Sequence, residues 1–451
     1  MSTTSPAGAR PGPDAVEPAC TALVVFGITG DLARKKTFAA LHELQHFGWA
    51  GVPVIGVGRS AWTDDDIRAA AADAVGGDAD TAFLERFSYV RGDYTDAALY
   101  RRLERALAEH PAVLCYLAVP PTVFEDVVVG LAATDLRDRV RLMIEKPFGT
   151  DLRSAERLQA RLTAHFDERC VYAVDHYLQK EAVQNISVVR FANRILEAVW
   201  SAAHIDSIIV TMAESFGVEG RAGFFDHAGT LRDVVQSHVL QIVVGLAMEP
   251  PTPGSTDDVN ERRCELLAAI APLQPADVVF GQYDGYTSQE GVDADSTTDT
   301  YVRARLTIDN PRWRGTAWTL VAGKALAETC TSVEITFRAA SGHTGADDDP
   351  APAPNRFVLV LSPEESITLS LRARSSSVAL GSTGADMVSD ASYRAGDALS
   401  PYARVFDDVR RGDHTPFTRF DVVEAAWRVV QPLLERRAPP RPYRRGTWGP
   451  T

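Results

Sequence analysis

The sequence predicts an α/β protein: an N-terminal, doubly wound parallel sheet, followed by a larger α+β domain with a mixed, mainly antiparallel sheet. Up to about residue 178, short apolar runs alternate with amphipathic segments of helical periodicity, which is the pattern of βαβ units. Beyond residue 180, most later strand-like runs follow one another without helices between them, which favours antiparallel neighbours. We therefore expect domains at 21–178 and 179–451, and interpret the polar, Pro- and Gly-rich residues 1–20 as a disordered leader.

The first domain alternates strands and helices along its whole length. Its first strand is apolar throughout, as expected of a strand that is buried on both faces. Gly48 is a plausible stop for the helix that follows, and a run of acidic residues suits the start of the next helix. The expected strands are 21–27, 52–58, 87–94, 112–119, 139–149 and 171–178. The expected helices are 31–48, 63–75, 96–110, 122–133 and 151–166.

The second domain mixes helices with consecutive strands. Helices are expected at 180–193 and 230–249, where apolar residues recur at helical spacing. Residues 341–355 have the composition of a surface loop. The expected strands are 207–215, 301–308, 316–323, 332–337, 356–361 and 366–373.

Composition excludes several classes of partner. The chain has 451 residues, with 46 Lys and Arg against 60 Asp and Glu, giving a net charge of −14. Such a chain has no electrostatic footprint for nucleic acid or anionic membrane, so an anionic ligand must be met by a few bases gathered in a cleft. The five cysteines are scattered, which argues against a disulfide framework and a zinc site. We find no apolar membrane span and no export signal, and expect a cytoplasmic protein.

A glycine-rich turn predicts a dinucleotide site in a Rossmann-like domain. The first strand runs directly into G-I-T-G-D-L-A, from Gly27 through Thr29, Gly30, Asp31 and Leu32 to Ala33. Glycines there let backbone amides approach a pyrophosphate at the positive end of the helix dipole. The alternative is structural, because tight turns between a strand and a helix also require glycine.

Arg59 and Ser60 follow the second strand, where NAD enzymes usually place an acidic residue for the ribose 2′-hydroxyl. An Arg at this place accommodates a 2′-phosphate instead. The residues therefore favour NADP, with NAD as a weaker alternative. The competing interpretation of Arg59 is a solvated surface side chain.

Ionisable residues cluster at two further strand ends and on one helix. Lys146 lies in E-K-P-F-G, and Asp175 opens D-H-Y-L-Q-K-E; ligands of parallel sheets bind at such carboxyl ends. His238 shares the apolar face of its helix, which suits either a hydrogen-bonded core histidine or a general base. Asp233 would lie about 140° from His238 on an α-helix, so we take Asp175 as the better candidate to orient His238.

The motifs together resemble the glucose-6-phosphate dehydrogenase family. They occur in the order G-x-T-G-D-L-A-R-K-K, G-V-G-R-S, L-A-V-P-P-T-V, E-K-P-F-G, D-H-Y-L-Q-K-E, R-F-A-N-R, E-S-F-G-V-E-G-R-A-G-F-F-D, R-D-V-V-Q-S-H-V-L-Q and A-G-K-A-L. The resemblance covers nearly the whole chain, from about residue 22 to the closing R-P-Y-R-R-G-T-W-G-P-T. D-H-Y-L-x-K-E is the most specific of these motifs.

The resemblance implies oxidation of glucose 6-phosphate at C1 to a 6-phosphoglucono-lactone, the first oxidative step of the pentose phosphate pathway, with hydride transfer to NADP. His238 would take the proton of the C1 hydroxyl and Asp175 would steady the imidazolium. A homodimer or homotetramer is also implied. The implied substrate residues are His176, Tyr177, Lys180, Glu214, Asp233, Lys324, Lys146 and Lys36. The implied cofactor residues are Gly27, Thr29, Gly30, Asp31, Leu32, Arg59, Ser60, Asp93, Tyr94 and Lys146.

Some positions depart from the family pattern. Thr329 stands where a second basic residue is common, Ser237 where an Asn precedes the catalytic His, and Gln179 where a Gly is usual; Phe124 replaces a frequent Tyr. Thr329 motivates a paralogue acting on another hexose or amino-sugar 6-phosphate. Two alternative functions stay open. One is that of the inositol and glucose-fructose oxidoreductases, which carry E-K-P as well; the other is that of a regulatory subunit with an inactive site.

Overall fold

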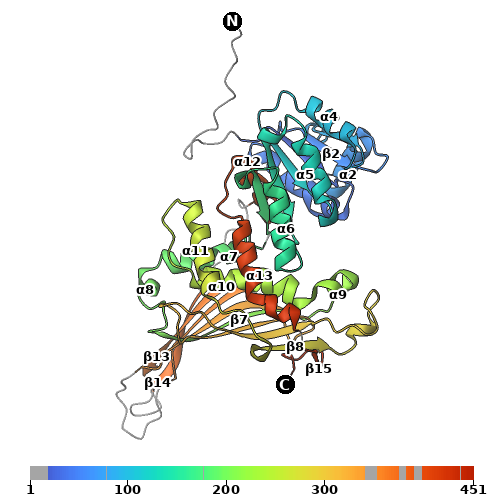
Figure 1. Cartoon of the computed structure of the whole chain (residues 1–451). Coiled ribbons are helices and arrows are strands. Elements are labelled where there is room, and N and C mark those ends of the chain that lie inside the picture. The colour runs from blue at the N-terminus through green and yellow to red at the C-terminus, as the bar shows by residue number, and fades with distance from the viewer. Residues whose placement is uncertain are drawn as a thin grey trace. The chain divides into compact units, whose positions relative to one another are not determined.

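The computed structural model describes residues 19–77, 79–175, 177–340, 353–374, 382–390, 399–436 and 438–450. The expected leader, apart from its last two residues, and positions 341–352 of the expected loop lie outside these ranges. The chain divides into two compact units, each built from several segments (Figure 1). The first comprises Met1–Pro147, Leu158–His176 and Ala398–Thr418; the second comprises Phe148–Arg157, Tyr177–Asp397 and Arg419–Thr451. The segment 398–418 thus joins the first unit, although the single predicted boundary placed it in the second domain.

The first unit is built on a six-stranded sheet whose pairs are all parallel, in the order β3-β2-β1-β4-β5-β6. This order is that of a doubly wound dinucleotide-binding sheet, and it confirms the predicted fold of the N-terminal half. Four of the strands are buried along their whole length, as their uninterrupted apolar runs predict. The strands are β1 (Ala22–Phe26), β2 (Val54–Gly58), β3 (Phe87–Arg91), β4 (Val113–Leu117), β5 (Val140–Glu145) and β6 (Val171–Val174).

Capping residues mark the start of α2 and the end of the first helical stretch of this unit. At α2, the Thr63 hydroxyl accepts from the Asp66 amide while the Asp66 carboxylate accepts from the Thr63 amide, a reciprocal cap. Gly48 closes the first helical stretch with φ +83°, a value that glycine adopts without strain. The helices are α1 (Phe38–Glu43), α2 (Asp64–Ala74), α3 (Thr81–Glu85), α4 (Ala97–Ala106), α5 (Phe124–Ala132) and α6 (Leu152–Thr163), the last crossing between the two units.

The helix expected at 31–48 is not one regular helix, and this part of the prediction was wrong in detail. A π-helical segment, η1 (Ala33–Thr37), precedes α1, and a 3₁₀ turn, η2 (Leu44–Phe47), follows it. Apolar spacing cannot distinguish these forms, because all three place residues three to five apart on a shared face.

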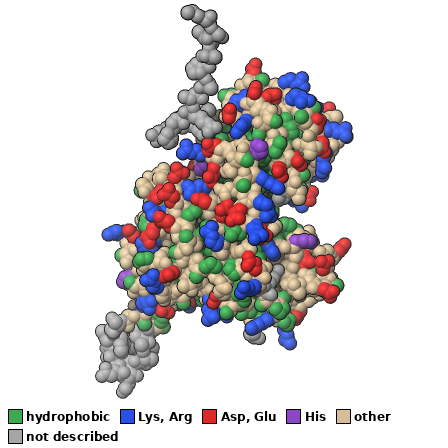
Figure 2. Space-filling view, viewed as in Figure 1, with side chains coloured by type: hydrophobic (Ala, Val, Ile, Leu, Met, Phe, Trp, Pro, Cys, Tyr) green, Lys and Arg blue, Asp and Glu red, His purple; other side chains and the backbone are tan. Residues whose placement is uncertain are grey.

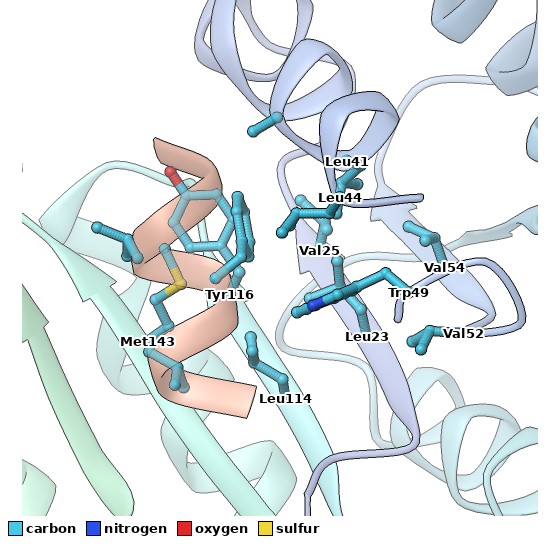
Figure 3. Close-up of a cluster of buried hydrophobic side chains, with 14 of the residues drawn as sticks. Leu23, Val25, Leu41, Leu44, Trp49, Val52, Val54, Leu114, Tyr116 and Met143 are labelled. Atoms are coloured by element: carbon cyan, nitrogen blue, oxygen red, sulfur yellow. The ribbon is translucent and has the colours of Figure 1, made fainter. Parts of the chain in front are cut away.

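A helix from the C-terminal part of the chain closes the core of the first unit. Figure 3 shows α12 (Pro401–Arg411, salmon) against Leu114 and Tyr116 of β4. Phe406 of α12 meets the rings of Tyr116 and Trp49 edge-on at 5.3 and 6.3 Å. The Trp49 indole N–H also donates to the Asp407 carboxylate at 3.0 Å. The sequence pattern did not identify this element, because its partners lie far away in the chain.

The second unit is built on a nine-stranded sheet within the described residues, in the order β14-β13-β12-β11-β7-β10-β9-β8-β15 (Figure 1). Only the pairs β7–β10 and β8–β15 are parallel, so the prediction of a mixed, mainly antiparallel sheet is confirmed. The strands are β7 (Ile205–Ala213), β8 (Val278–Tyr283), β9 (Tyr301–Leu306), β10 (Ala317–Gly323), β11 (Cys330–Phe337), β12 (Arg356–Ser362), β13 (Ser366–Arg374), β14 (Ser382–Asp390) and β15 (Arg441–Tyr443).

Helices cover one face of this sheet, and the segment against its central strands is π-helical. The π-helical segment η6 (Leu231–Val239) packs on β7, β9 and β10 and continues as α10 (Leu240–Ala247). The expected helix at 230–249 is therefore present, but its first half has i→i+5 geometry. The remaining helices of this unit are α7 (Glu181–Phe191), α8 (Arg194–Glu197), α9 (Ala222–Thr230), α11 (Thr256–Ala269) and α13 (Phe420–Glu435).

Figure 2 shows Lys and Arg side chains interspersed with Asp and Glu over the face in view. Among the described residues, no helix has the length and apolar character needed to span a membrane, and no group of three or more His, Cys, Asp or Glu could hold a metal ion.

Candidate active site

The turn after β1 has the geometry that its glycines predict. Gly27 has φ +83°, and a Cβ there would lie 2.3 Å from the Ala118 carbonyl oxygen, so no larger residue fits. The Gly30 amide donates to the Gly27 carbonyl at 2.9 Å, which tightens the turn. Asp31 and Leu32 form the first helical residues after it, with Asp31 exposed. The turn therefore brings the backbone to the start of a helix at the carboxyl edge of the sheet, where a pyrophosphate fits.

The ends of β2 and β3 surround this turn with polar side chains. Ser60 donates to the Thr29 hydroxyl at 3.5 Å, and the Tyr89 hydroxyl donates to the Ser60 carbonyl at 3.0 Å. Arg59, which precedes Ser60 in the chain, is exposed. The structure thus brings Ser60 against Thr29, with Arg59 adjacent in the chain.

Asp93 and Tyr94 follow β3 and differ in their exposure. The Asp93 carboxylate accepts from the Thr95 amide at 3.0 Å and from its hydroxyl at 2.7 Å; these bonds hold the Asp93 pKa below its usual value. Burial raises the pKa of Tyr94, whose ring meets Phe26 edge-on at 6.0 Å and whose hydroxyl hydrogen-bonds at the Gly27 backbone. Tyr94 therefore supports the glycine turn from within the protein.

Lys36 lies on the π-helical segment η1. It is exposed and follows two further bases, Arg34 and Lys35. The Lys35 ammonium pairs with Asp31 at 3.7 Å between exposed side chains, and Arg34 lies over the Trp62 ring at 5.7 Å. Within the described chain, neither Lys36 nor Arg34 forms an ion pair, whereas Lys35 does.

Lys146 and Asp175 lie together at the carboxyl ends of neighbouring strands. β5 and β6 are aligned so that Glu145 is opposite Val174, and the Lys146 ammonium lies 3.5 Å from the Asp175 carboxylate. Asp175 is only 7% exposed and the Lys146 side chain 21%. A buried carboxylate needs such a cation to remain charged.

Glu145 adds a carboxyl group that the sequence analysis did not single out. The Tyr116 hydroxyl donates to its Oε1 at 2.9 Å. Burial raises the Glu145 pKa to about 7, although hydrogen bonds from Tyr116 and Tyr402 oppose the shift. The residue just before Lys146 therefore titrates near neutral pH.

In the second unit, Tyr177, Lys180 and His238 come together from distant parts of the sequence. The rings of Tyr177 and His238 lie 4.5 Å apart between centroids, and the Lys180 ammonium lies 4.9 Å above the Tyr177 ring. Tyr177 is buried, His238 half-buried and Lys180 exposed. His176, predicted between Asp175 and Tyr177, lies outside the described residues.

The π-helical geometry of η6 changes the predicted relation between Asp233 and His238. An i→i+5 pattern widens the turn to roughly 80° per residue, so residues five apart differ by roughly 40° rather than 140°. Both side chains are half-buried. The 140° separation assumed an α-helix, whereas the segment is π-helical, which turns the two positions toward one face. The Ser237 hydroxyl donates to the Asp233 carbonyl at 2.7 Å, within this widened turn.

Glu214 and Lys324 form an ion pair at the ends of two neighbouring parallel strands, β7 and β10. The Lys324 side chain is 14% exposed and its ammonium lies over the Phe216 and Phe225 rings, at 5.4 and 5.1 Å. Such a pair offers carboxylate acceptors and ammonium donors with no net charge. It is therefore suited to the hydroxyl groups of a neutral sugar ring.

The turn that carries Lys324 is held by residues to which the sequence analysis gave no role in positioning it. Ala325 has φ +51°, a left-handed conformation unusual for a residue with a Cβ. The buried Tyr443 hydroxyl donates to the Lys324 carbonyl at 2.6 Å and lies 3.0 Å from the Thr300 hydroxyl. Thr329 accepts from the Ser215 amide at 2.9 Å, and the two hydroxyls lie 2.8 Å apart.

Comparison with known proteins matches both halves of the chain. Residues 24–185 match the family model "Glucose-6-phosphate dehydrogenase, NAD binding domain", and residues 187–451 match "Glucose-6-phosphate dehydrogenase, C-terminal domain". The chain is 40% identical over 436 residues to glucose-6-phosphate 1-dehydrogenase 1 of Mycobacterium tuberculosis, covering 95% of this chain and 92% of that protein. It is 34% identical over 465 residues to the Bacillus subtilis glucose-6-phosphate 1-dehydrogenase, covering 95% and 94%.

Solved structures agree with these relatives. The crystal structure of glucose-6-phosphate 1-dehydrogenase from Mycobacterium avium has a TM-score of 0.88 at 40% identity, covering 96% of each chain. A glucose-6-phosphate dehydrogenase in complex with its substrate glucose 6-phosphate has a TM-score of 0.89 at 32% identity, again covering 96% of each chain.

Proposed function

Because the chain belongs to the glucose-6-phosphate dehydrogenase family, we propose that it oxidises glucose 6-phosphate at C1 to 6-phosphoglucono-1,5-lactone. The electron acceptor is NADP, and the reaction is the first oxidative step of the pentose phosphate pathway. The observation that carries the proposal is the grouping of Tyr177, Lys180 and His238. A half-buried imidazole beside the residues expected to hold a phosphate is what this chemistry requires.

His238 acts as the general base. Removing the proton of the C1 hydroxyl as hydride leaves raises the electron density at C1 and lowers the barrier to hydride departure. Asp175 stabilises the imidazolium that results.

Charged and polar side chains bind the sugar phosphate. Lys180, with Tyr177 and His176, binds the phosphate, since an ammonium is a strong point charge for a phosphate monoester. Glu214, Lys324 and Asp233 bind the sugar hydroxyls. The Glu214–Lys324 pair is already matched in charge, so binding a neutral ring leaves no charge uncompensated.

The cofactor is held by the first unit. The nicotinamide accepts the hydride, and the chain supplies only binding and orientation. The Gly27–Gly30 turn leads directly into a helix at the carboxyl end of β1, and a helix N-terminus in that place binds a pyrophosphate through its backbone amides. Arg59 selects NADP through the 2′-phosphate, with NAD the weaker alternative. Lys36 and Lys146 serve both ligands, and Asp93 and Tyr94 lie at the adenine side.

We also propose a homodimer or homotetramer in the cytoplasm. On β7, which helices cover on one face, Ile209 points to the other face and is 37% exposed. A relative from Arabidopsis thaliana is named as a cytoplasmic form. Light scattering of the purified protein tests the oligomeric state, and a monomer at micromolar concentration would exclude it.

One observation favours a second candidate, a dehydrogenase of another hexose or amino-sugar 6-phosphate. Thr329 stands where the family commonly has a basic residue. Its hydroxyl is hydrogen-bonded to Ser215, the neighbour of Glu214 in the chain. The deciding experiment follows nicotinamide reduction with glucose, galactose and glucosamine 6-phosphates, each with NADP and with NAD. If kcat/KM is highest with glucose 6-phosphate and NADP, the first proposal is supported. If kcat/KM is clearly higher with another sugar phosphate, the second candidate takes its place.

A further inference from the structure

A second arginine, Arg91, is fixed against the backbone of Arg59. β2 and β3 are parallel neighbours whose last residues, Gly58 and Arg91, are directly opposite. The Arg91 Nε donates to the Arg59 carbonyl at 3.3 Å, and the Gly92 amide donates to the Gly58 carbonyl at 3.0 Å. The Arg91 guanidinium is thus tied to the chain at the residue expected to read the cofactor ribose.

A third arginine supports the position of Arg91. The Nη2 of Arg102, on α4, donates to the Arg91 carbonyl at 2.7 Å. Arg59 and Arg91 are exposed and Arg102 is half-buried. Two guanidinium groups, those of Arg91 and Arg102, are thus bonded to the backbone at the carboxyl ends of β2 and β3, where the chain also carries Arg59, in a protein whose net charge is −14.

No carboxylate of the described chain forms an ion pair with these three arginines. The nearest acid by sequence, Asp93, accepts hydrogen bonds from the Thr95 amide and hydroxyl, and the charge of Arg59 also lowers the pKa of Asp93. Asp64, next to the same strand, accepts from the Tyr89 amide at 2.7 Å. Asp93 thus offsets part of the charge of Arg59, and the exposed Arg91 guanidinium keeps its charge for a ligand.

We propose that Arg91 is a second ligand of the cofactor 2′-phosphate, acting with Arg59 and setting the preference for NADP over NAD. This proposal rests on the proposed function only in taking the cofactor to be NADP. The single hydrogen bond to the Arg59 carbonyl occupies Nε, so both Nη groups remain for phosphate oxygens. A phosphate monoester carries up to two negative charges and three acceptor oxygens, which two guanidinium forks satisfy better than one.

The test measures KM for NADP and for NAD in Arg91→Ala, Arg91→Lys and Arg59→Ala. Arg91→Ala should raise KM for NADP roughly tenfold and leave KM for NAD within about twofold, because charge-assisted bonds to the 2′-phosphate are lost. Arg91→Lys should restore part of the loss. Arg101→Ala, an exposed arginine one position earlier on α4, is the matched control and should change neither constant.

A purely structural role for Arg91 predicts a different pattern. Loss of the bond to the Arg59 carbonyl would disturb the whole adenosine site, so KM would rise equally for NADP and NAD. An equal rise, or no change for NADP, overturns the proposal. If Arg59→Ala alone loses NADP selectively, the NADP assignment stands and the role of Arg91 is refuted.

A binding measurement keeps the test independent of dehydrogenase activity. Calorimetric titration with adenosine 2′,5′-bisphosphate and with adenosine 5′-monophosphate compares the same base with and without the 2′-phosphate. The wild type should bind the bisphosphate more tightly than the monophosphate. In Arg91→Ala the ratio of the two affinities should fall roughly tenfold, and the affinity for the bisphosphate should depend less on salt concentration. Equal affinities in the wild type refute the 2′-phosphate site itself, whatever sugar the enzyme oxidises.

Discussion

Replacing Glu145 with Gln should remove a pH dependence of stability that the wild-type protein shows near neutral pH. Glu145 closes β5 and accepts a hydrogen bond from Tyr116. Burial of its carboxyl group raises the pKa from 4.5 to about 7. Asp175 adds to this rise, whereas Lys146 and the hydrogen bond from Tyr402 oppose it.

The sign of the effect follows from the raised pKa of the folded state. The folded protein holds the Glu145 proton more tightly than the unfolded chain, so the stabilisation is complete below about pH 4.5 and is lost as the pH rises through about 7. A shift of about 2.5 units corresponds to about 3 kcal/mol, at about 1.4 kcal/mol per unit. Because the residue keeps partial exposure, we take this as the upper value.

The assay is urea unfolding followed by tryptophan fluorescence between about pH 5 and about pH 8. The free energy of unfolding of the wild type should fall relative to Glu145→Gln by up to about 3 kcal/mol across this range. Glu109→Gln, at an exposed position, is the control and should follow the wild type. Parallel pH profiles for wild type and Glu145→Gln would refute the reasoning, since the carboxyl group would then titrate equally in both states.

Three further predictions follow from the site. His238→Asn should lower kcat roughly 10²–10⁴-fold while calorimetry shows sugar phosphate still bound; wild-type turnover would exclude His238 as the base. Gly27→Ala should cost more than about 2 kcal/mol, because a Cβ would overlap the Ala118 carbonyl and φ is +83°; an unchanged melting temperature would contradict the turn geometry. Tyr443→Phe should raise KM for the sugar phosphate roughly three- to tenfold with kcat little changed, since the turn carrying Lys324 loses a hydrogen bond; KM and kcat changing together would instead indicate general loss of structure.

The sequence predicted the elements whose signals are local. Apolar runs located the six parallel strands of the first unit, because strands buried on both faces need continuous hydrophobic segments. Gly27 and Gly48 were found because each closes a turn in the left-handed region of backbone space. Arg59 and Ser60 were assigned to the cofactor site because they follow the second strand, and ligands bind at the carboxyl ends of parallel strands.

Several features instead depend on contacts between distant segments. The helix α12 closes the core over Trp49 and Tyr116, yet nothing in its own sequence names those partners. Tyr443 lies on β15, near the end of the chain, and β15 pairs with β8. This pairing places the Tyr443 hydroxyl where it donates to the Lys324 carbonyl. The raised pKa of Glu145 also requires the tertiary structure, since desolvation comes from residues brought over it by folding.

The angle between the Asp233 and His238 side chains depends both on the sequence and on the tertiary structure. Their spacing of five residues is a property of the sequence, and on an α-helix it would separate the side chains by about 140°. Only the folded chain decides that the segment is π-helical, which brings both onto one face. Residue types, the order of the motifs along the chain and the family all follow from the amino-acid sequence. The π-helical form of η6 is rare, and apolar spacing does not predict it; η6 packs against β7, β9 and β10, and such tertiary contacts supply most of the stability of a helix in a protein.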